Sequence, residues 1–448
     1  MRKFFGTDGI RGVANEFPMT PSMAVRVGQA IAATLDPEIK GIAVGRDPRL
    51  SGDMLEAALM AGISSCGSPC FRLGVLPTPA IAYMTRKLRV SAGIVISASH
   101  NPMEDNGIKV FGPDGFKLTD QQELALERRL ESDHADFPHP VGSRIGYITE
   151  IHDAARQYSD FLKGLFIDLD LSGMRITLDC ANGATSKIAP FLFQELGAEV
   201  LPIHFHPDGL NINHECGAMY PRVLVREVQS SQSAIGFSFD GDGDRVICVD
   251  EQGAILTGDY ILLSLAKDLK ENGRLSHDLL VTTVMSNLGL FKAAGQLGVN
   301  VKQTQVGDRY VLEEMMESGA ILGGEDSGHI IFLDGEHTTG DGIFIALKLL
   351  EVIRRQGRPV SSLEKILRRY PQILTGVPVQ SRVDLSMIPE IQQAISEAEE
   401  ELGEEGRVLV RYSGTQTIVR IMVEGPDPQT TERIAGRITG VVRHRLGK

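Results

Sequence analysis

The segment from Ser97 to Pro102 is where this chain most plainly offers chemistry. It places small hydroxyl side chains and a proline-stiffened turn directly after the apolar run 92–96. A hydroxyl is thus presented at the end of an expected strand, where ligands of α/β folds gather. Gly107 and Lys109 follow within a few residues, close enough in the chain to bring a cation back to the hydroxyl. Serine, asparagine and proline also form ordinary turns, so the segment alone does not establish a site.

Three aspartates at alternate positions form the second signal. Asp240, Asp242 and Asp244 are separated by glycines and lead into the apolar run 246–249. The glycines let the backbone curl so that three hard oxygen ligands converge, as a divalent cation requires. An EF-hand is excluded, because Arg245 stands where that loop needs glycine. A turn without a metal is the alternative, although it leaves three like charges side by side.

Two further clusters offer groups that suit a phosphorylated sugar. The loop 323–329 carries a carboxylate and a hydroxyl that could bond to sugar hydroxyls, although a plain loop has the same composition. Its last residue, His329, could be structural or could move a proton. Near the C-terminus, residues 411–420 place two arginines around a Ser-Gly-Thr turn in an otherwise acidic protein. That combination indicates an anion site.

Together these motifs resemble those of the α-D-phosphohexomutases. The matching segments are Ser99-His100-Asn101-Pro102, Asp240-Gly241-Asp242-Gly243-Asp244-Arg245, the loop 323–329 and Ser413-Gly414-Thr415. Segments 5–12, 45–52, 208–213 and 304–310 are similar to those of bacterial members that act on glucosamine phosphates. The chain departs from the usual family pattern at Pro48, Asp326 and Gln416-Thr417.

The resemblance implies a role for each matching residue. Ser99 would be phosphorylated and would bind the metal through its phosphate, together with the three aspartates Asp240, Asp242 and Asp244. The sugar would be held by Glu325, Ser327, Asp308 and Arg309. The distal phosphate would be held by Arg411, Ser413, Gly414, Thr415 and Arg420. The catalytic residues besides the serine would be Arg11, Lys109, His100 and His329.

Lys109 is the preferred acid or base among them. Burial beside a cation such as Arg11, which the resemblance places near the phosphoserine, would lower the pKa of Lys109 toward the working range. His100 is adjacent to Ser99, but neighbours in an extended chain point to opposite faces, so a structural role is equally open.

The elements that must position these residues alternate between short apolar strands and helices. Strands are expected over 41–45, 94–96, 174–179 and 279–284, and helices over 53–63, 121–130 and 188–196. This alternation predicts three consecutive mixed α/β sheet domains. After residue 370, a helix over 389–402 and strands over 407–411 and 417–423 predict a smaller α+β C-terminal domain.

Combined with this organisation, the resemblance implies four domains around a central cleft. They are a phosphoserine domain (1–150), a metal-binding domain (151–256), a sugar-binding domain (257–370) and a C-terminal phosphate-binding domain (371–448).

The composition limits the class of protein. A chain of 448 residues is too long for a single core. A net charge of −13 disfavours nucleic acid as a partner, and no apolar run approaches membrane-spanning length. Five cysteines without paired metal-ligand spacing, and an N-terminus without a signal-peptide pattern, predict reduced thiols in a cytoplasmic protein.

The resemblance predicts an isomerase, an intramolecular phosphotransferase that interconverts glucosamine 6-phosphate and glucosamine 1-phosphate. The reaction would use the phosphoserine, a glucosamine 1,6-bisphosphate intermediate and one Mg²⁺ per active site, and would feed amino-sugar nucleotide and peptidoglycan precursor synthesis. The expected partner is a phosphorylated hexosamine, with a homodimer as a possible assembly and no membrane. The alternatives are a phosphoglucomutase/phosphomannomutase, a metal-dependent sugar phosphatase and a non-catalytic sugar-phosphate sensor.

Overall fold

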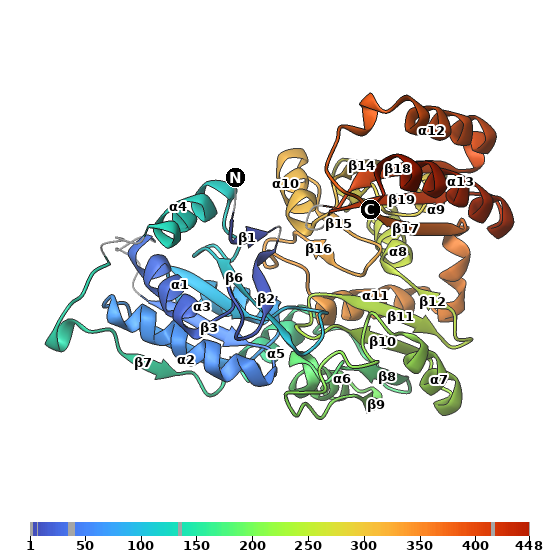
Figure 1. The fold of residues 1–448 in the computed structure, drawn as a ribbon. Coiled ribbons are helices and arrows are strands. Elements are labelled where there is room, and N and C mark those ends of the chain that lie inside the picture. The colour runs from blue at the N-terminus through green and yellow to red at the C-terminus, as the bar shows by residue number, and fades with distance from the viewer. Residues whose placement is uncertain (1–2, 7, 35–40, 133–136, 414–416, 448) are drawn as a thin grey trace. The chain divides into compact units, whose positions relative to one another are not determined.

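The structure is a computed structural model that describes residues 3–6, 8–34, 41–132, 137–413 and 417–447 (Figure 1). The chain divides into two compact units. The larger unit comprises residues 1–284 and 299–365, and the smaller unit comprises residues 285–298 and 366–448.

The first sheet of the larger unit has seven strands in the order β1-β2-β6-β5-β3-β4-β7. Their bounds are β1 (Phe5–Gly6), β2 (Gly9–Val13), β3 (Ile42–Arg46), β4 (Cys70–Val75), β5 (Ala92–Ile96), β6 (Asp105–Phe111) and β7 (Ile148–Glu150). Strand β3 pairs in parallel with β4 and β5, whereas β6 runs antiparallel to β5 and β2. The helices of this region are α1 (Pro21–Thr34), α2 (Leu50–Ser65), α3 (Thr78–Leu88) and α4 (Asp120–Glu131). Every residue of β5 is buried, as its apolar sequence requires.

The second sheet has five strands in the order β12-β11-β10-β8-β9. Their bounds are β8 (Arg175–Asp179), β9 (Glu199–Ile203), β10 (Ile235–Phe239), β11 (Val246–Asp250) and β12 (Ile255–Leu256). Strands β9, β8 and β10 are parallel, and β11 is antiparallel to β10. The helices here are α5 (Ala154–Leu165), α6 (Ala189–Glu195) and α7 (Arg222–Ser231).

The third sheet has four strands in the order β14-β13-β15-β16. Their bounds are β13 (Leu279–Thr283), β14 (Asn300–Thr304), β15 (Leu322–Gly324) and β16 (Ile330–Phe332). The helices are α8 (Gly258–Glu271), α10 (Asp308–Ser318) and α11 (Gly342–Gln356). Strand β15 is parallel to β13 and antiparallel to β16.

One topological feature recurs in all three sheets. Each has a parallel strand followed directly by an antiparallel neighbour, namely β5 and β6, β10 and β11, and β15 and β16. The connections between them are the segments with serine, aspartate and glutamate that the sequence singled out. The same place in three sheets therefore carries three different chemical groups.

The smaller unit has one antiparallel sheet in the order β17-β19-β18. Its elements are α9 (Leu288–Gln296), β17 (Gln372–Pro378), α12 (Pro389–Leu402), β18 (Arg407–Tyr412), β19 (Ile418–Glu424) and α13 (Pro428–Leu446). The segment 285–298 packs in this unit, where Asn287 Nδ2 donates to the carbonyl oxygen of Tyr370 at 3.0 Å and to Glu424 at 3.0 Å. Short 3-10 helices lie at 142–144, 184–187, 276–278, 360–362, 364–366, 385–387 and 403–405.

The expected fold class is confirmed, since three mixed α/β sheets precede a smaller α+β unit. The arrangement of four domains around one cleft, and the domain boundaries, stay predictions. Within the described residues, no helix combines the length and apolar character needed to cross a membrane.

Candidate active site

Two loops from different sheets meet at Ser99. This residue lies between β5 and β6, is buried, and has a left-handed φ of 53°. Its Oγ donates to Asp240 Oδ2 at 2.5 Å, and Asp240 lies in the connection between β10 and β11. A Cβ at Gly241 would lie 2.7 Å from the carbonyl oxygen of Ser99, so this approach requires glycine. Gly241 thus allows the loop of Asp240, Asp242 and Asp244 (the aspartate loop) to contact the loop of Ser99 (the serine loop).

The three aspartates form a compact buried group whose ligand atoms lie within 4.8 Å of one another. Thr78 Oγ1 donates to Asp242 Oδ2 at 2.6 Å, and Lys109 Nζ lies 2.9 Å from the same oxygen. In the part of the chain that the structure describes, the buried Oδ1 atoms of Asp242 and Asp244 accept no hydrogen bond. Two buried carboxylate oxygens that accept no hydrogen bond from the described residues, in a group of three converging carboxylates, fit a hard divalent cation.

The like charges also change the pKa of Asp240. Burial, and then the carboxylates of Asp244 and Asp242, raise the pKa of Asp240 well above its usual value. The pKa of Asp244 moves the opposite way, because Lys109 and His329 outweigh the effect of burial. Cationic side chains therefore balance the negative charge of Asp244 but not that of Asp240.

The expected pKa of Lys109 is wrong. The side chain is buried as expected, but three carboxylates surround Nζ, at 2.9 Å from Asp242, 3.1 Å from Asp8 and 3.3 Å from Asp244. Burial opposes the charge, yet these carboxylates raise the pKa of Lys109 well above its usual value. The neighbouring cation Arg11 lowers the pKa, but its effect is smaller than that of each carboxylate, so Lys109 is held as a cation.

The N-terminal signature brings a fourth carboxylate to the site. Asp8 pairs with Arg11 and Lys109, and its Oδ1 lies 2.6 Å from Lys117 Nζ. Lys117 also pairs with Asp308, one of the predicted sugar-binding residues. Asp8 and Lys117 were not predicted as site residues, although the acidic residue inside the motif at 5–12 was a usable signal.

Both predicted histidines lie close to the serine and aspartate loops. His100 Nδ1 lies 3.3 Å from Ser99 Oγ, and burial followed by the charges of Arg245 and Arg11 lowers the pKa of His100 to about 4. His329 is buried, with Nδ1 at 3.6 Å from Asp244 and Nε2 at 3.5 Å from Asp308. Burial opposes its charge, but Asp244 outweighs burial and raises the pKa of His329.

A buried arginine, Arg49, anchors the backbone of the serine loop. Arg49 is fully buried and donates to the carbonyl oxygens of Ser99 at 3.0 Å and Asn101 at 2.8 Å. Its Nε donates to Asp47 Oδ2 at 2.8 Å, and the same carboxylate accepts from Ser97 Oγ at 2.6 Å. Ser97 Oγ in turn accepts from the backbone N–H of Ser99 at 2.9 Å. The segment 45–52, whose role the sequence did not reveal, thus fixes the backbone that presents Ser99.

Asn213 completes this support from the second sheet's loops. Its Nδ2 donates to the carbonyl oxygens of Ser99 at 2.8 Å and Asn101 at 3.0 Å. The predicted glucosamine-type segment 208–213 therefore ends in a contact to the serine loop.

The third loop places Glu325 and Ser327 together. Ser327 Oγ donates to Glu325 Oε2 at 3.3 Å, and Glu325 Oε1 accepts from the backbone N–H of Gly307 at 3.1 Å. Asp326, where the chain departs from the family pattern, bonds to the Thr257 hydroxyl at the start of α8. That contact gives Asp326 a role in fixing the loop to α8.

Arg309 is largely engaged by the first sheet's helix α4. Its guanidinium is buried, donates to Asp120 at 2.7 Å and to Glu123 Oε2 at 2.8 Å, and lies 3.5 Å from the carbonyl oxygen of Leu118. A sugar contact by Arg309 stays a prediction, since these bonds explain its burial without a ligand.

In the smaller unit, Arg411 and Arg420 are directly opposite each other on β18 and β19. Burial, followed by the charge of Arg420, lowers the pKa of Arg411. Two like charges at facing positions are unfavourable unless an anion joins them. Ser413 follows β18, with its backbone N–H donating to Ile418 at 2.8 Å. The predicted phosphate-binding residues Gly414 and Thr415 lie outside the described residues.

Comparisons with known proteins identify the family of the chain. Four domain models of the phosphoglucomutase/phosphomannomutase family match the chain: α/β/α domain I at residues 2–136, domain II at 156–253, domain III at 257–370 and the C-terminal domain at 374–441. The chain belongs to this family.

Curated relatives are similar over the full length. The chain is 50% identical over 450 residues to a phosphoglucosamine mutase of Syntrophus aciditrophicus (strain SB), with 100% of both chains covered. It is 47% identical to a phosphoglucosamine mutase of Anoxybacillus flavithermus, again with 100% of both covered. The predicted class, an isomerase that is an intramolecular phosphotransferase of the phosphohexomutase type, is confirmed by these relatives.

Solved structures share the fold. A phosphoglucomutase/phosphomannomutase family protein from Burkholderia thailandensis superposes with a TM-score of 0.79 at 24% identity, covering 99% of each chain. The N-acetylphosphoglucosamine mutase of Aspergillus fumigatus, solved in complex with GlcNAc-6P and magnesium, has a TM-score of 0.69 at 18% identity, covering 99% of this chain and 96% of that one.

Proposed function

We propose that this protein interconverts glucosamine 6-phosphate and glucosamine 1-phosphate through a phosphorylated Ser99. The observation that carries the proposal is the 2.5 Å contact between Ser99 Oγ and Asp240. Arg49 anchors the backbone of the serine loop, and the loop contacts the buried group of three aspartates. The relatives named phosphoglucosamine mutase, at about half identity over the whole chain, support the amino-sugar substrate.

The chemistry is two phosphoryl transfers with a common carrier. In the first, the bond between Ser99 Oγ and phosphorus breaks, and a bond forms to the free hydroxyl of the sugar. That hydroxyl loses a proton and Ser99 Oγ gains one, so the reaction conserves protons and charge. A glucosamine 1,6-bisphosphate results, and in the second transfer Ser99 accepts the other phosphoryl group. A reoriented intermediate must stay bound between the two steps.

The carboxylates would hold one magnesium ion together with the phosphate on Ser99. Asp240, Asp242 and Asp244 are the proposed ligands, since two of their buried oxygens accept no bond from any described residue. A bound magnesium ion withdraws charge from a transferring phosphoryl group. Lys109, held as a cation between these carboxylates, adds a second positive charge beside Asp242 and Asp244.

His100 is the proposed proton carrier at Ser99 Oγ. Its Nδ1 lies 3.3 Å from that oxygen, and its lowered pKa keeps the ring neutral near pH 7. This assignment replaces the expectation that Lys109 is the base, because a lysine with a raised pKa is a poor proton acceptor. His329 is proposed to orient Asp244 and Asp308. Arg11, whose Nη1 lies 3.5 Å from the carbonyl oxygen of Ala98, is proposed to contact the phosphate on Ser99.

Substrate contacts complete the proposal. Glu325 and Ser327 would bond to sugar hydroxyls, with Asp308 and Arg309, the first two residues of α10, as further contacts. The facing pair Arg411 and Arg420, with Ser413, Gly414 and Thr415, would bind the phosphate that is not being transferred.

The test follows turnover by phosphorus NMR. Purified protein, phosphorylated at Ser99, is incubated with magnesium and glucosamine 6-phosphate, with glucose 6-phosphate and mannose 6-phosphate in parallel. We expect preferred formation of glucosamine 1-phosphate, and none from the Ser99→Ala variant. Ser97→Ala is the matched control, since Ser97 is a buried neighbour that bonds to Asp47 and the Ser99 amide, and mass spectrometry should still find phosphate on residue 99.

Other outcomes separate the alternatives. Faster conversion of glucose or mannose phosphate would keep the mechanism and change the substrate. Stoichiometric release of inorganic phosphate would indicate a phosphatase, and binding without turnover would indicate a sensor. A cytoplasmic location, a role before peptidoglycan synthesis and a homodimer are further parts of the proposal; the free state of all five cysteines is compatible with a reducing compartment.

A further inference from the structure

A second group of metal-type ligands lies away from the serine, in the second sheet's domain. Among the described residues, the ligand atoms of Asp179, His204 and Cys216 lie within 4.8 Å of one another. Asp179 is the last residue of β8, and His204 directly follows β9, the parallel neighbour of β8. Because the carboxyl ends of parallel strands share an edge, the topology itself brings these two side chains together. Cys216 comes from the loop that precedes α7.

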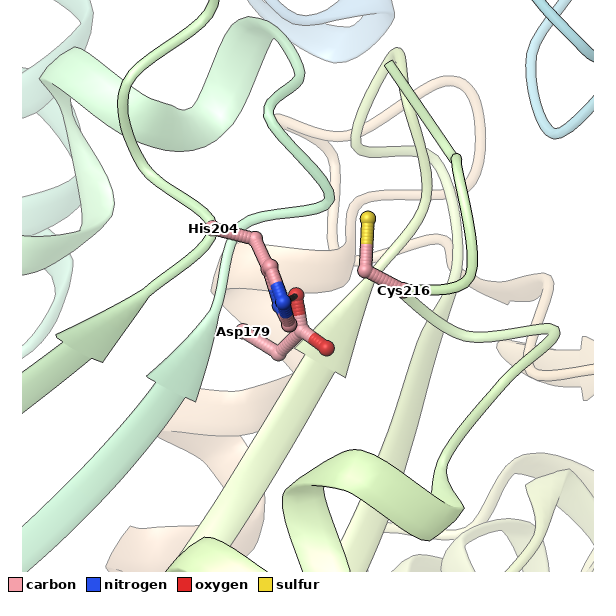
Figure 2. A group of neighbouring side chains, drawn as sticks. All are labelled: Asp179, His204 and Cys216. Carbon is pink, nitrogen blue, oxygen red and sulfur yellow. Dashed lines mark hydrogen bonds and ion pairs between the residues drawn. The ribbon is translucent and has the colours of Figure 1, made fainter. Parts of the chain in front are cut away.

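The carboxylate and the imidazole are already placed as neighbouring ligands would be. Asp179 Oδ1 lies 3.1 Å from His204 Nδ1, and Figure 2 shows the two groups side by side with the sulfur of Cys216 to one side of them. Two ligands on a tetrahedral zinc ion at about 2.1 Å are themselves separated by about 3.4 Å. To reach its usual separation from an oxygen ligand, about 3.5 Å, the sulfur would move in by at most about 1.3 Å from the 4.8 Å limit.

Backbone amides fix the carboxylate. The N–H of Ala181 donates to Asp179 Oδ1 at 3.0 Å, and the N–H of Gly217 donates to Asp179 Oδ2 at 3.0 Å. Bonds of this kind orient metal-bound carboxylates and leave further lone pairs for the ion. The residue after Cys216 is thus itself tied to Asp179, which holds the cysteine backbone near the other two ligands.

The donor set differs from that of the aspartate loop in the property that selects a metal. Three carboxylates offer only hard oxygen, whereas this group offers nitrogen, oxygen and sulfur, which zinc prefers. A thiolate and a carboxylate would balance the charge of a divalent ion. Asp179 and Cys216 are buried, but the side chain of His204 is 30% exposed, which leaves a route for an ion and for a water as the fourth ligand.

We propose that Asp179, His204 and Cys216 bind a zinc ion or a similar divalent cation, separate from the ion of the aspartate loop. Binding releases the thiol proton of Cys216, and the proton between His204 and Asp179 moves to the far ring nitrogen or to solvent, so that Nδ1 faces the metal. Without metal, the same proton forms the hydrogen bond seen here. Because the thiolate is the form of cysteine that binds a metal, binding of the ion and loss of this thiol proton are coupled.

The site would stiffen the support of Ser99. Its three ligands flank the loop that carries Asn213, whose side chain bonds to the carbonyl oxygens of Ser99 and Asn101. The backbone N–H of Asn213 also donates to Ala181, two residues after Asp179. A bound ion would join β8, β9 and this loop at one point, so it acts on stability and leaves the chemistry at Ser99 to other groups.

The test uses cobalt as a spectroscopic substitute for zinc. The full-length protein is freed of metal with a chelator, saturated with magnesium to fill the aspartate loop, and titrated with Co²⁺. We expect a thiolate-to-cobalt charge-transfer band that saturates at one cobalt per chain and disappears when Zn²⁺ is added. The aspartate loop has no sulfur ligand, so this band cannot arise there. Mutase activity is not the readout, so failure of this proposal is distinct from failure of the proposed function.

Two variants make the assignment specific. Cys216→Ala should abolish the band, and Cys180→Ala should keep it, since Cys180 is a buried thiol next to Asp179 but outside the ligand group. His204→Asn changes a partly exposed side chain and should lower zinc affinity at least tenfold, seen as a smaller rise of melting temperature with Zn²⁺. Absence of the band in the unaltered protein, its persistence in Cys216→Ala, or an unchanged zinc-induced shift in His204→Asn would overturn the proposal.

Discussion

Two groups of carboxylates in this protein differ in how the residues around them change their pKa values. The aspartate loop (Asp240, Asp242 and Asp244) has a member, Asp240, whose pKa is raised well above its usual value by burial and by its two neighbours. The histidine cluster (Asp334, His337 and Asp341) has a member, Asp334, whose pKa is lowered to about 2, because bonds from His337 outweigh burial.

The two groups differ in the source of the positive charge that balances their carboxylates. In the histidine cluster the chain supplies it: His337 Nδ1 lies 3.3 Å from Asp334 and Nε2 lies 3.4 Å from Asp341. In the aspartate loop Lys109 reaches Asp242 and Asp244, while Asp240 depends on the more distant Arg245 and on the Ser99 hydroxyl. The negative charge of a structural carboxylate is balanced by a cationic side chain of the protein. The negative charge of a carboxylate that binds a metal is instead balanced by the metal ion.

The largest expected effect comes from removing the uncompensated charge. Asp240→Asn should lower kcat/KM more than about a hundredfold, since a metal at such a site contributes several kcal/mol to the transition state. The same change should raise the melting temperature of the magnesium-free protein, because it removes a buried charge that two neighbours oppose. Turnover of glucosamine 6-phosphate and thermal unfolding without metal measure the two effects. A fall in both quantities would contradict the comparison.

The matched substitution in the histidine cluster should lower the melting temperature and leave kcat/KM unchanged. Asp341→Asn removes a charge that faces His337 and keeps an oxygen for the N-terminal cap of α11, where Asp341 Oδ1 accepts from Phe344 at 3.0 Å. Breaking a buried ion pair costs about 4 kcal/mol of folding stability. We expect a lower melting temperature at neutral pH and unchanged kcat/KM. Equal stability in the variant and the unaltered protein would show that His337 does not need this partner.

The pH dependence of stability offers a somewhat smaller effect at the same cluster. Burial opposes the charge of His337, but bonds from Asp334 and Asp341 raise its pKa to about 9 from an ordinary 6.5. A histidine with a raised pKa in the folded state contributes stability that is complete below about pH 6.5 and is lost as the pH rises through about 9. The loss is on the order of 3 kcal/mol.

Melting temperatures between pH 6 and 10 would measure it. The unaltered protein should lose stability across this range, whereas His337→Gln should be less stable at pH 6 and should show a flatter profile. Parallel profiles for the two proteins would mean that His337 is neutral in the folded state.

The fold and the motif residues were predictable because their signals are local. Strands such as β5 and helices such as α12 follow from short runs of apolar or periodic residues, and α12 has the predicted bounds Pro389–Leu402. The serine and aspartate motifs were singled out from residue types and spacing, but hydroxyls after a strand also form ordinary turns, so it was the resemblance to the α-D-phosphohexomutases that assigned them their roles.

What the sequence did not reveal depends on contacts between distant segments. The pKa of Lys109 was predicted to fall because only Arg11 was considered, whereas Asp8 and Asp242 reach its amine from segments about 100 and 130 residues away. Asp47 meets Ser97 only because β3 pairs in parallel with β5. The sequence showed Cys216 only as one of five cysteines without metal-ligand spacing. Asp179 and His204 come near it because β8 and β9 pair in parallel, and the spacing of the three residues in the sequence does not reveal this.

The smallest effect is expected from a change that alters no charge in either group. Asn213→Ala removes two hydrogen bonds to the carbonyl oxygens of Ser99 and Asn101, while Arg49 continues to hold both. A neutral hydrogen bond contributes about 1 kcal/mol, and Arg49 offsets part of the loss of two, so kcat should fall about fivefold with an unchanged KM for glucosamine 6-phosphate.

Asn211→Ala is the control on the same loop, because Asn211 Nδ2 donates to His206 at 3.0 Å and bonds to nothing in the serine loop among the described contacts. A lower kcat in Asn213→Ala alone would mean that the position of Ser99, independently of the charge around Asp240, limits the reaction. Equal losses in both variants would assign the effect to the loop as a whole, and electrostatics alone would then distinguish the aspartate loop from the histidine cluster.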